Sequence, residues 1–312
     1  MTTDNDTETA WGVVAVSGAT GKQGGATARR LLAGGRPVRA LVRDVTAPAA
    51  VALAEAGAEL VLADLDDPSS LGRALAGAAA LFAVPPTVYG PAGDNEELEF
   101  ARGRALADAA AEAKVRQVVY TGVASTTGTA FAAPGKRRTE RYLRERIEQV
   151  TVLRPVRFMT NYLGLAGIGL DGFADGVNRH LFPPDEPMQI IALEDIAEFA
   201  ALAFEQPDRF AGRTLELAGD APTPVEAVAA IGAATGLALR YEQFTHEEAA
   251  ALNPELAMVR QQWAAGHRWR ADIEALRVIH PGLRTLADWL AEGGAAALRT
   301  RLLATAGAGS RA

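Results

Sequence analysis

The chain of 312 residues contains no cysteine and only four histidines. The absence of cysteine excludes thiolate nucleophiles, disulfides, iron–sulfur clusters and thiolate zinc sites. The histidines lack the His-Glu-x-x-His spacing of a zinc-binding helix, so we expect them at the surface or at helix caps and predict no metal site. They are His180, His246, His267 and His280.

Long apolar runs are also missing. No stretch approaches the roughly 18 apolar residues that span a bilayer. The N-terminus carries Asp4, Asp6 and Glu8 and lacks the basic region of a secretory signal peptide. We therefore expect a soluble, cytoplasmic protein with no membrane partner.

Positive charge is in the minority, because the formal net charge is −7 at pH 7. Nucleic acid requires a concentrated cationic surface, so we expect no direct binding to it. One cluster of basic residues stands out: Lys136, Arg137, Arg138, Arg141, Arg144 and Arg146. Glutamates follow at helical ion-pair spacing, as in Arg141 with Glu145 and Arg144 with Glu148, which predicts a solvated helix face.

Hydrophobic residues make up 49% of the chain, enough for a substantial buried core. From Gly12 onward, short β-branched runs alternate with Ala- and Leu-rich amphipathic segments, a pattern typical of parallel strands joined by helical crossovers. The predicted strands cover residues 13–17, 38–42, 59–63, 80–84, 117–121 and 150–153. Asp94 with Glu97 resembles a capping box that opens a long helix. The predicted fold class is α/β, a doubly wound parallel sheet of the Rossmann type.

After Arg154 the alternation stops, and frequent glycine and proline predict loops over a site. A smaller unit follows, with strands over 214–217 and 237–244, a helix that begins at Thr223, and a helical region that ends near Glu292. We predict a Rossmann domain over 11–155 and an interleaved, mostly helical C-terminal substrate subdomain over 156–300, with strands that return near the core. Residues 1–10 and 301–312 are expected to be flexible tails.

A glycine-rich turn directly follows the first predicted strand and precedes a helix-like stretch. Gly18 and Gly21 suit a turn where a pyrophosphate approaches main-chain N–H groups, because a Cβ there would hold it away. Gly24 shares a helical face with Ala28 and Leu31, so the helix can lie close to the sheet. This placement favours a dinucleotide site over a purely structural turn. The residues assigned to the cofactor are Gly18, Ala19, Thr20, Gly21, Lys22, Gln23 and Gly24.

The end of the second strand selects the cofactor in this fold, since an acid there accepts the 2′-hydroxyl of NAD and an arginine binds the 2′-phosphate of NADP. Here the strand ends at Arg43, followed by Asp44. Guanidinium–phosphate hydrogen bonds contribute about 1.5–3 kcal/mol, at least a tenfold preference, so we predict NADP(H). Lys22 adds charge near the same phosphate. The alternative is an Arg43 that is merely exposed at a strand end.

Asp64 ends the third predicted strand. Its carboxylate can accept a hydrogen bond from the adenine amino group, with Leu65 packed beside the base. The alternative is a turn, with Asp66, Asp67 and Pro68, that precedes a helix.

Several separated motifs point to one family. They are Gly18-Ala-Thr-Gly-Lys-Gln-Gly24, Leu41-Val-Arg-Asp44, Gly135-Lys-Arg-Arg-Thr-Glu140, Leu153-Arg-Pro-Val-Arg-Phe-Met-Thr-Asn-Tyr162, Ala271-Asp-Ile-Glu, His280-Pro-Gly-Leu and Asp288-Trp-Leu. From Val13 to about Leu290, the chain resembles the NmrA-like family of atypical short-chain dehydrogenases/reductases.

The resemblance implies roles for residues beyond the glycine-rich turn. Lys136 matches the lysine that reaches the nicotinamide ribose, and we assign it to catalysis and to cofactor binding. Phe158 and Asn161 match the segment that flanks the nicotinamide. Val84 and Pro85, at a strand end, would pass under the cofactor.

The sequence also departs from its relatives. Mainstream dehydrogenases of this superfamily use a tyrosine four residues before the lysine as proton donor, and that position is Ala132 here. Of the nearby tyrosines, Tyr120 lies in a predicted strand and is expected in the core, while Tyr89 and Tyr162 lie near predicted loops. Val156-Arg157 replaces the glycine and apolar or aromatic residue that the family often has.

Three functional hypotheses remain open. The first is an NADPH-dependent oxidoreductase that transfers hydride to a quinone or conjugated carbonyl, an acceptor whose reduced oxygen needs less help from an enzymic acid. The second is a non-catalytic NADP(H)-binding sensor that acts through a protein partner or through homo-oligomer changes. A sugar-nucleotide epimerase, the third, would ordinarily require the tyrosine that Ala132 replaces.

Overall fold

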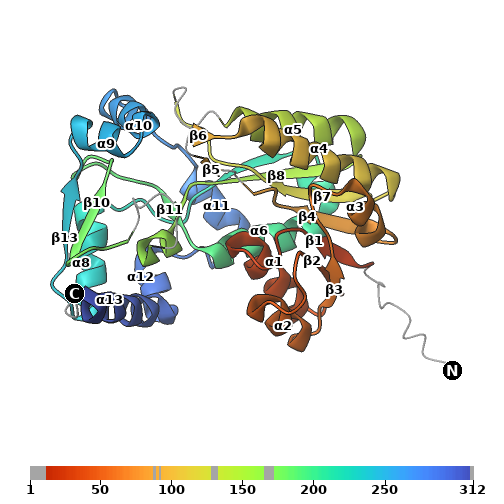
Figure 1. Ribbon diagram of the computed structural model, residues 1–312, viewed down its shortest axis with the longest axis horizontal. Helices are drawn as coiled ribbons and strands as arrows, with labels where there is room; N and C mark the ends of the chain where they lie inside the picture. Colours follow the sequence, from red (N-terminus) through yellow and green to blue (C-terminus); the bar gives the residue numbers. More distant parts are fainter. Residues whose placement is uncertain (1–11, 87–88, 91–92, 128–132, 165–171, 310–312) are drawn as a thin grey trace.

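The computed structural model describes the chain apart from residues 1–11, 87–88, 91–92, 128–132, 165–171 and 310–312 (Figure 1). Its centre is a parallel sheet in the order β12-β8-β7-β4-β1-β2-β3. The strands are β1 (Val14–Val16), β2 (Val38–Val42), β3 (Glu59–Leu62), β4 (Ala80–Ala83), β7 (Gln117–Thr121), β8 (Gln149–Pro155) and β12 (Thr214–Leu217). The predicted doubly wound α/β fold is confirmed.

Helices cover both faces of this sheet (Figure 1). On one face lie α1 (Lys22–Ala33), α2 (Pro48–Glu55) and α6 (Leu193–Glu205), which share one apolar core. On the other lie α3 (Pro68–Leu75), α4 (Glu96–Glu112) and α5 (Pro134–Arg146), which share a second core. The strand order reverses between β1 and β4. In open α/β sheets, ligands bind beyond the carboxyl ends of the strands at such a point.

The remaining elements form a smaller, mostly helical part of the molecule (Figure 1). In it β9 pairs with β11 and β10 pairs with β13, both in parallel. Its elements are β9 (Arg157–Phe158), the 3-10 helix η1 (Met159–Leu163), β10 (Val177–His180), β11 (Ile190–Ile191), α8 (Pro224–Thr235), β13 (Arg240–Gln243), α9 (His246–Leu252), α10 (Pro254–Ala264), α11 (Ile273–Ile279), α12 (Leu286–Trp289), the π-helical turn η2 (Leu290–Gly294) and α13 (Ala295–Gly309). The short helix α7 (Pro207–Phe210) connects α6 to β12 of the main sheet. A short antiparallel pair, β5 (Tyr89–Gly90) and β6 (Gly93–Asp94), precedes α4.

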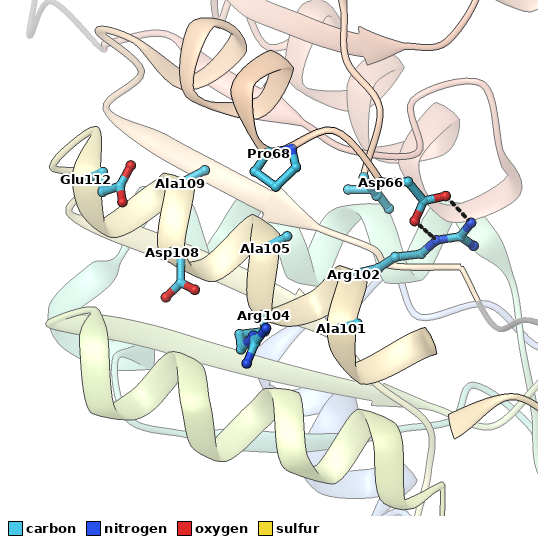
Figure 2. A pocket seen from close by; sticks show the side chains of 10 residues that line it. Asp66, Pro68, Ala101, Arg102, Arg104, Ala105, Asp108, Ala109 and Glu112 are labelled. Carbon is cyan, nitrogen blue, oxygen red and sulfur yellow. Dashed lines mark hydrogen bonds and ion pairs between the residues drawn. The ribbon is translucent and has the colours of Figure 1, made fainter. Parts of the chain in front are cut away.

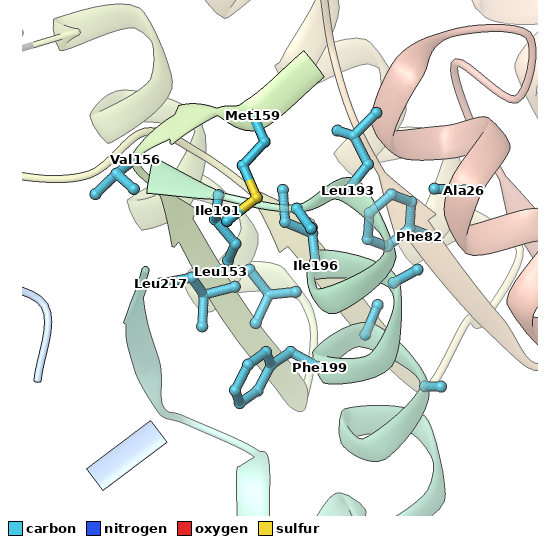
Figure 3. Close-up of a cluster of buried hydrophobic side chains, with 14 of the residues drawn as sticks. Ala26, Phe82, Leu153, Val156, Met159, Ile191, Leu193, Ile196, Phe199 and Leu217 are labelled. Atoms are coloured by element: carbon cyan, nitrogen blue, oxygen red, sulfur yellow. The ribbon is translucent and has the colours of Figure 1, made fainter. Parts of the chain in front are cut away.

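One buried apolar cluster joins the two parts (Figure 3). Leu153 of β8 and Leu217 of β12 lie in it with Ile191 of β11 and Met159 of η1. β12 and α6 follow residue 155 in sequence, yet they belong to the main sheet and its helical layer. Because the main part includes elements on both sides of residue 155, the domain boundary at 155 stays a prediction.

Some local predictions were wrong. Asn95, not Asp94, caps α4, because its side chain accepts the N–H of Leu98. The helical region does not end near Glu292, since α13 continues to Gly309 through most of the expected tail at 301–312. The strand expected over 237–244 is limited to Arg240–Gln243. By contrast, the helix start at Thr223 is confirmed by a complete capping box with Glu226.

The basic cluster of α5 is exposed at Arg141, Arg144 and Arg146, as predicted, and half-buried at Lys136, Arg137 and Arg138. Arg144 donates to the carbonyl oxygens of Gly212 and Arg213, at 2.8 and 3.3 Å, and thereby fastens the start of β12. Arg138 pairs with Glu97, so α5 is tied to α4 as well. The exposed Arg144 thus bonds to the start of β12 and not to Glu148.

No helix in the described part of the chain is both long enough and apolar enough to span a bilayer.

Candidate active site

A cleft of about 980 Å³ lies beyond the carboxyl ends of the central strands and extends under α10. All but one of the predicted site residues line it. They are Gly18, Thr20, Gly21, Lys22, Gln23, Gly24, Arg43, Asp64, Leu65, Val84, Pro85, Lys136, Phe158 and Asn161. The exception is Ala19, which is buried in the core beside the turn. The cleft thus brings together residues from both parts of the molecule.

The turn after β1 is shaped to receive an anion. Gly18 has a φ of +58°, and a Cβ there would lie 2.5 Å from Cγ1 of Val84. Gly21 caps α1 without a side-chain hydrogen bond, so the first N–H groups of that helix have neither an intrahelical partner nor a capping side chain. Such a helix start attracts phosphate through its N–H groups and dipole. The residues present therefore fit a dinucleotide pyrophosphate.

Gly24 brings the helix close to the turn. A Cβ at this position would lie 2.3 Å from the carbonyl oxygen of Gly18 and 2.8 Å from that of Ser17. The Ser17 hydroxyl donates to the carbonyl of Phe82 and accepts the N–H of Val84 at 2.8 Å. The ends of β1 and β4 are thereby fixed to each other, which sets Val84 in the cleft wall.

At the predicted adenosine end, Arg43 is exposed and lines the cleft. Asp44 turns toward Thr46, whose hydroxyl and N–H donate to its carboxylate at 2.6 and 2.8 Å. The Thr46 hydroxyl and N–H lower the pKa of Asp44 below its ordinary value. Asp64 accepts the N–H of Asp66 at 3.0 Å, as in the predicted turn, and still lines the cleft.

An ion pair that sequence reasoning missed borders this end (Figure 2). Arg102 of α4 donates to both carboxylate oxygens of Asp66, at 2.8 and 2.5 Å. The hydrogen bond from Arg102 lowers the pKa of Asp66. Both residues line the cleft and also an adjoining groove of about 420 Å³ between α3 and α4. The two residues are 36 positions apart in the sequence, so no local pattern signals the pair.

Lys22 does not lie with Arg43 as expected. Its ammonium donates to the side-chain oxygen of Asn161 at 3.2 Å. Asn161 follows β8, which lies on the opposite side of β1 from β2. Lys22 is thereby placed at the end of the cleft predicted for the nicotinamide.

Lys136 lies in the cleft wall at the start of α5. Its ammonium is 2.6 Å from a carboxylate oxygen of Glu99 on α4, and their side chains are only 11% and 5% exposed. Glu99 was not predicted. Lys136 lines the cleft, whereas Glu99 does not.

No tyrosine among the described side chains takes the place of the missing proton donor. Tyr120 is fully buried, as predicted, and burial raises its pKa well above its ordinary value. Tyr162 is buried beneath the guanidinium of Arg157, whose carbon lies 4.2 Å from the ring centre. Ala132 and the side chain of Tyr89 lie outside the described residues.

The other end of the cleft is largely apolar and aromatic. It is lined by His180, Leu181, Phe182, Leu256, Val259 and Trp269, with Val156 and Arg157 nearby in the wall. The expectation that His180 lies at the surface or a helix cap was wrong: it is 8% exposed and stacks on Phe182, with ring centres 4.3 Å apart. The cause is its position on β10, a strand that sequence reasoning did not find.

The fold and the glycine-rich cradle define a Rossmann-type dinucleotide-binding protein. The chain belongs to the NmrA-like family, whose model matches residues 11–281.

Relatives of this chain include oxidoreductases. An NmrA-like family domain-containing oxidoreductase of Aspergillus campestris is 30% identical over 73% of this chain and 74% of its own. A (4-alkanoyl-5-oxo-2,5-dihydrofuran-3-yl)methyl phosphate reductase of Streptomyces griseus is 32% identical over 74% of this chain and 77% of its own.

Solved structures share the fold. NmrA, a negative transcriptional regulator in complex with NAD, superposes with a TM-score of 0.72 at 20% identity, covering 90% of this chain and 94% of its own. An NADPH-dependent quinone oxidoreductase of Escherichia coli, solved with NADPH, gives 0.71 at 24% identity, covering 89% and 99%. Neighbours in fold thus bind either NAD or NADP(H).

Proposed function

We propose that this protein is an NADPH-dependent reductase that transfers hydride to a quinone or another conjugated carbonyl. The observation that carries the proposal is a single cleft with an anion cradle at one end and an aromatic pocket at the other, with Lys136 in its wall. A reductase of a conjugated lactone and a quinone oxidoreductase among the similar proteins support the acceptor class.

Each end of the cleft has its own task. The start of α1 would hold the pyrophosphate, and Phe158 and Asn161, which line the cleft, would border the nicotinamide. The cofactor, when bound, would supply the hydride. Phe182 and Trp269 would form the aromatic wall against which the acceptor binds.

Lys136 is the catalytic residue of this proposal. Its ammonium hydrogen bonds to the nicotinamide ribose and stabilises the negative charge that develops on the acceptor oxygen. A quinone or conjugated carbonyl spreads that charge over several atoms, so reduction proceeds without the tyrosine acid. This agrees with the absence of an available tyrosine among the described side chains that line the cleft.

The preference for NADPH rests on Arg43. Its guanidinium is exposed in the cleft wall, while the neighbouring Asp44 is held by Thr46. Binding to the 2′-phosphate is worth about 1.5–3 kcal/mol. We expect Arg43→Ala to weaken NADPH binding roughly tenfold or more and to leave NADH binding unchanged, by calorimetry. Equal affinities of the wild-type protein for both cofactors would contradict the preference.

The decisive experiment is NADPH oxidation by the purified protein with a panel of quinones and enones. We expect turnover that is faster with NADPH than with NADH and that is lost in Lys136→Ala while NADPH still binds. Arg141→Ala, an exposed residue on the same helix, is the matched control and should retain full turnover. Unchanged turnover in Lys136→Ala would remove that residue from the mechanism.

A second candidate is a non-catalytic NADP(H) sensor. The missing tyrosine supports it, and so does the fold of a negative transcriptional regulator. Tight NADPH binding without turnover of any acceptor, together with a cofactor-dependent change in oligomer size or in protein association, would favour the sensor over the reductase.

A further inference from the structure

The ion pair of Lys136 with Glu99 is almost completely buried, which is unusual for two charged side chains. Both belong to the contact between α4 and α5. Removing a charge from water is costly, so a buried ammonium and a buried carboxylate are retained as a pair. The pair also lies at the cleft, since Lys136 lines it.

The packing of the two helices holds Glu99 in position. At Gly135, next to Lys136, a Cβ would lie 2.8 Å from the carbonyl oxygen of Glu96 and 2.9 Å from the second carboxylate oxygen of Glu99. At Gly103, one turn further along α4, a Cβ would lie 2.4 Å from the hydroxyl oxygen of Thr139. Two glycines therefore allow the helices to approach closely, and the Glu99 carboxylate is built into their contact.

We propose that Glu99 is the positioning residue that orients the ammonium of Lys136 toward the cofactor and acceptor. The inference rests on the proposed role of Lys136 in the reductase. An ammonium has three N–H donors. One is directed to Glu99, which fixes the nitrogen and leaves two for the ribose and the acceptor oxygen.

This arrangement replaces part of what the missing tyrosine does elsewhere. In a tyrosine-lysine pair, the hydroxyl oxygen and the ammonium are set relative to each other, and both face the substrate. Here the partner of the lysine does not line the cleft, and its proposed role is to hold the lysine. The proposal therefore assigns no proton transfer to Glu99.

The same two helices supply a control. Glu97 of α4 pairs with Arg138 of α5, the same kind of interaction between neighbouring residues, but Glu97 is 78% exposed. Glu97→Gln removes a helix–helix ion pair without touching the cleft. Any loss that arises only from weaker contact between α4 and α5 should appear in this variant as well.

The experiment is a double-mutant cycle. Glu99→Gln, which keeps the size of the side chain, is made in the wild-type and in the Lys136→Met background. Turnover of a quinone and the dissociation constant of NADPH are measured, with thermal unfolding to verify the fold. We expect Glu99→Gln alone to lower kcat by up to roughly 10²-fold, the effect of a displaced catalytic group, and to change the KM of the quinone little.

In the Lys136→Met background, Glu99→Gln should cause no further loss, because its effect is transmitted by the lysine. Glu99→Asp keeps the charge and should restore part of the activity. If Glu99→Gln does not fold, Glu99→Asp takes its place in the cycle. Losses that multiply in the double variant, or an equal loss in Glu97→Gln, would overturn the proposal.

The NADPH dissociation constants separate this inference from the proposed reaction. If the wild-type protein binds NADPH but reduces no acceptor, the reductase is refuted. The double-mutant cycle then uses the NADPH dissociation constants alone. The positioning role is supported if Glu99→Gln weakens NADPH binding in the wild-type background and has no such effect in the Lys136→Met background. Independent effects on binding refute it.

Discussion

The two ends of the cleft are built in different ways. The phosphate end consists mainly of backbone from one short segment, residues 17–24, at the junction of β1 and α1. The aromatic end consists of side chains from separate elements: His180 from β10, Leu256 from α10, and Trp269 from the segment after α10. The comparison teaches that the phosphate end is set by local geometry, whereas the aromatic end depends on side chains that the fold brings together from distant parts of the sequence.

The two ends also differ in how tightly they are constrained. At the phosphate end, a methyl group added at Gly24 would lie within 3 Å of backbone atoms of Ser17 and Gly18. At the aromatic end, Phe182 contacts Trp263 and Trp269, with ring centres 4.5 and 5.7 Å apart. Such contacts are apolar and tolerate substitutions of similar size. We therefore expect substitutions that add a side chain against this backbone to affect NADPH binding and stability most.

The largest effect is expected for Gly24→Ala. The new methyl group would lie 2.3 Å from the carbonyl oxygen of Gly18, so α1 and the turn must move apart. Overpacking of this kind costs about 1–3 kcal/mol. We expect a loss of that size in the free energy of unfolding, measured with denaturant, and NADPH binding weakened about 10- to 100-fold.

Gly72→Ala is the matched control. Gly72 lies inside α3, and a Cβ there meets no described atom within 4 Å. Alanine in a helix interior is favoured over glycine by about 0.5–1 kcal/mol, so this variant should be slightly more stable and should bind NADPH normally. Normal binding by Gly24→Ala would refute the idea that backbone proximity defines the phosphate end.

A smaller effect is expected for Leu256→Ala at the aromatic end. Loss of an apolar wall should raise the KM of the quinone roughly tenfold and leave the NADPH dissociation constant unchanged. Met258→Ala on the same helix is the control, because Met258 is 51% exposed and does not line the cleft. Weaker cofactor binding by Leu256→Ala would show that the two ends are not independent.

The smallest effect concerns the ion pair of Asp66 with Arg102 at the phosphate half of the cleft. The pKa of the Asp66 carboxylate lies below its ordinary value of 3.8, mainly because Arg102 donates a hydrogen bond to it. A group with a lowered folded-state pKa adds stability above its unfolded value and loses it as the pH falls through the folded value. Below about pH 4, the wild-type protein should therefore lose stability faster than Asp66→Asn.

The difference should stay below about 1 kcal/mol, because Asp66 is 49% exposed and water screens the pair. Thermal unfolding at pH 7 and at pH 3 measures it. Asp67→Asn offers a comparison at the next residue, which caps α3 through Ser69 instead of pairing with Arg102. Parallel pH curves for the wild-type protein and Asp66→Asn would show that the ion pair adds nothing.

The sequence by itself determined the sheet, the turn and the cofactor end. Alternating apolar runs specify parallel strands, and Gly18, Gly21 and Gly24 specify a close approach, because both depend on spacing within a few residues. The predicted strands and nearly all the predicted cleft residues were found in place. Tyr120 was also placed in the core for a local reason, its position in a buried strand.

Only the tertiary structure decided the partners of charged residues and the aromatic end. The pairs of Glu99 with Lys136 and of Asp66 with Arg102 join residues 36 or more positions apart, so no local pattern signals them. The strand β9 has only two residues, and β10 has a single apolar residue, Val177, so neither shows an apolar run. With β10 unseen, the sequence placed His180 at the surface or a helix cap. Backbone geometry is specified by neighbours in the chain, whereas the chemistry of the acceptor pocket is specified by contacts that exist only after folding.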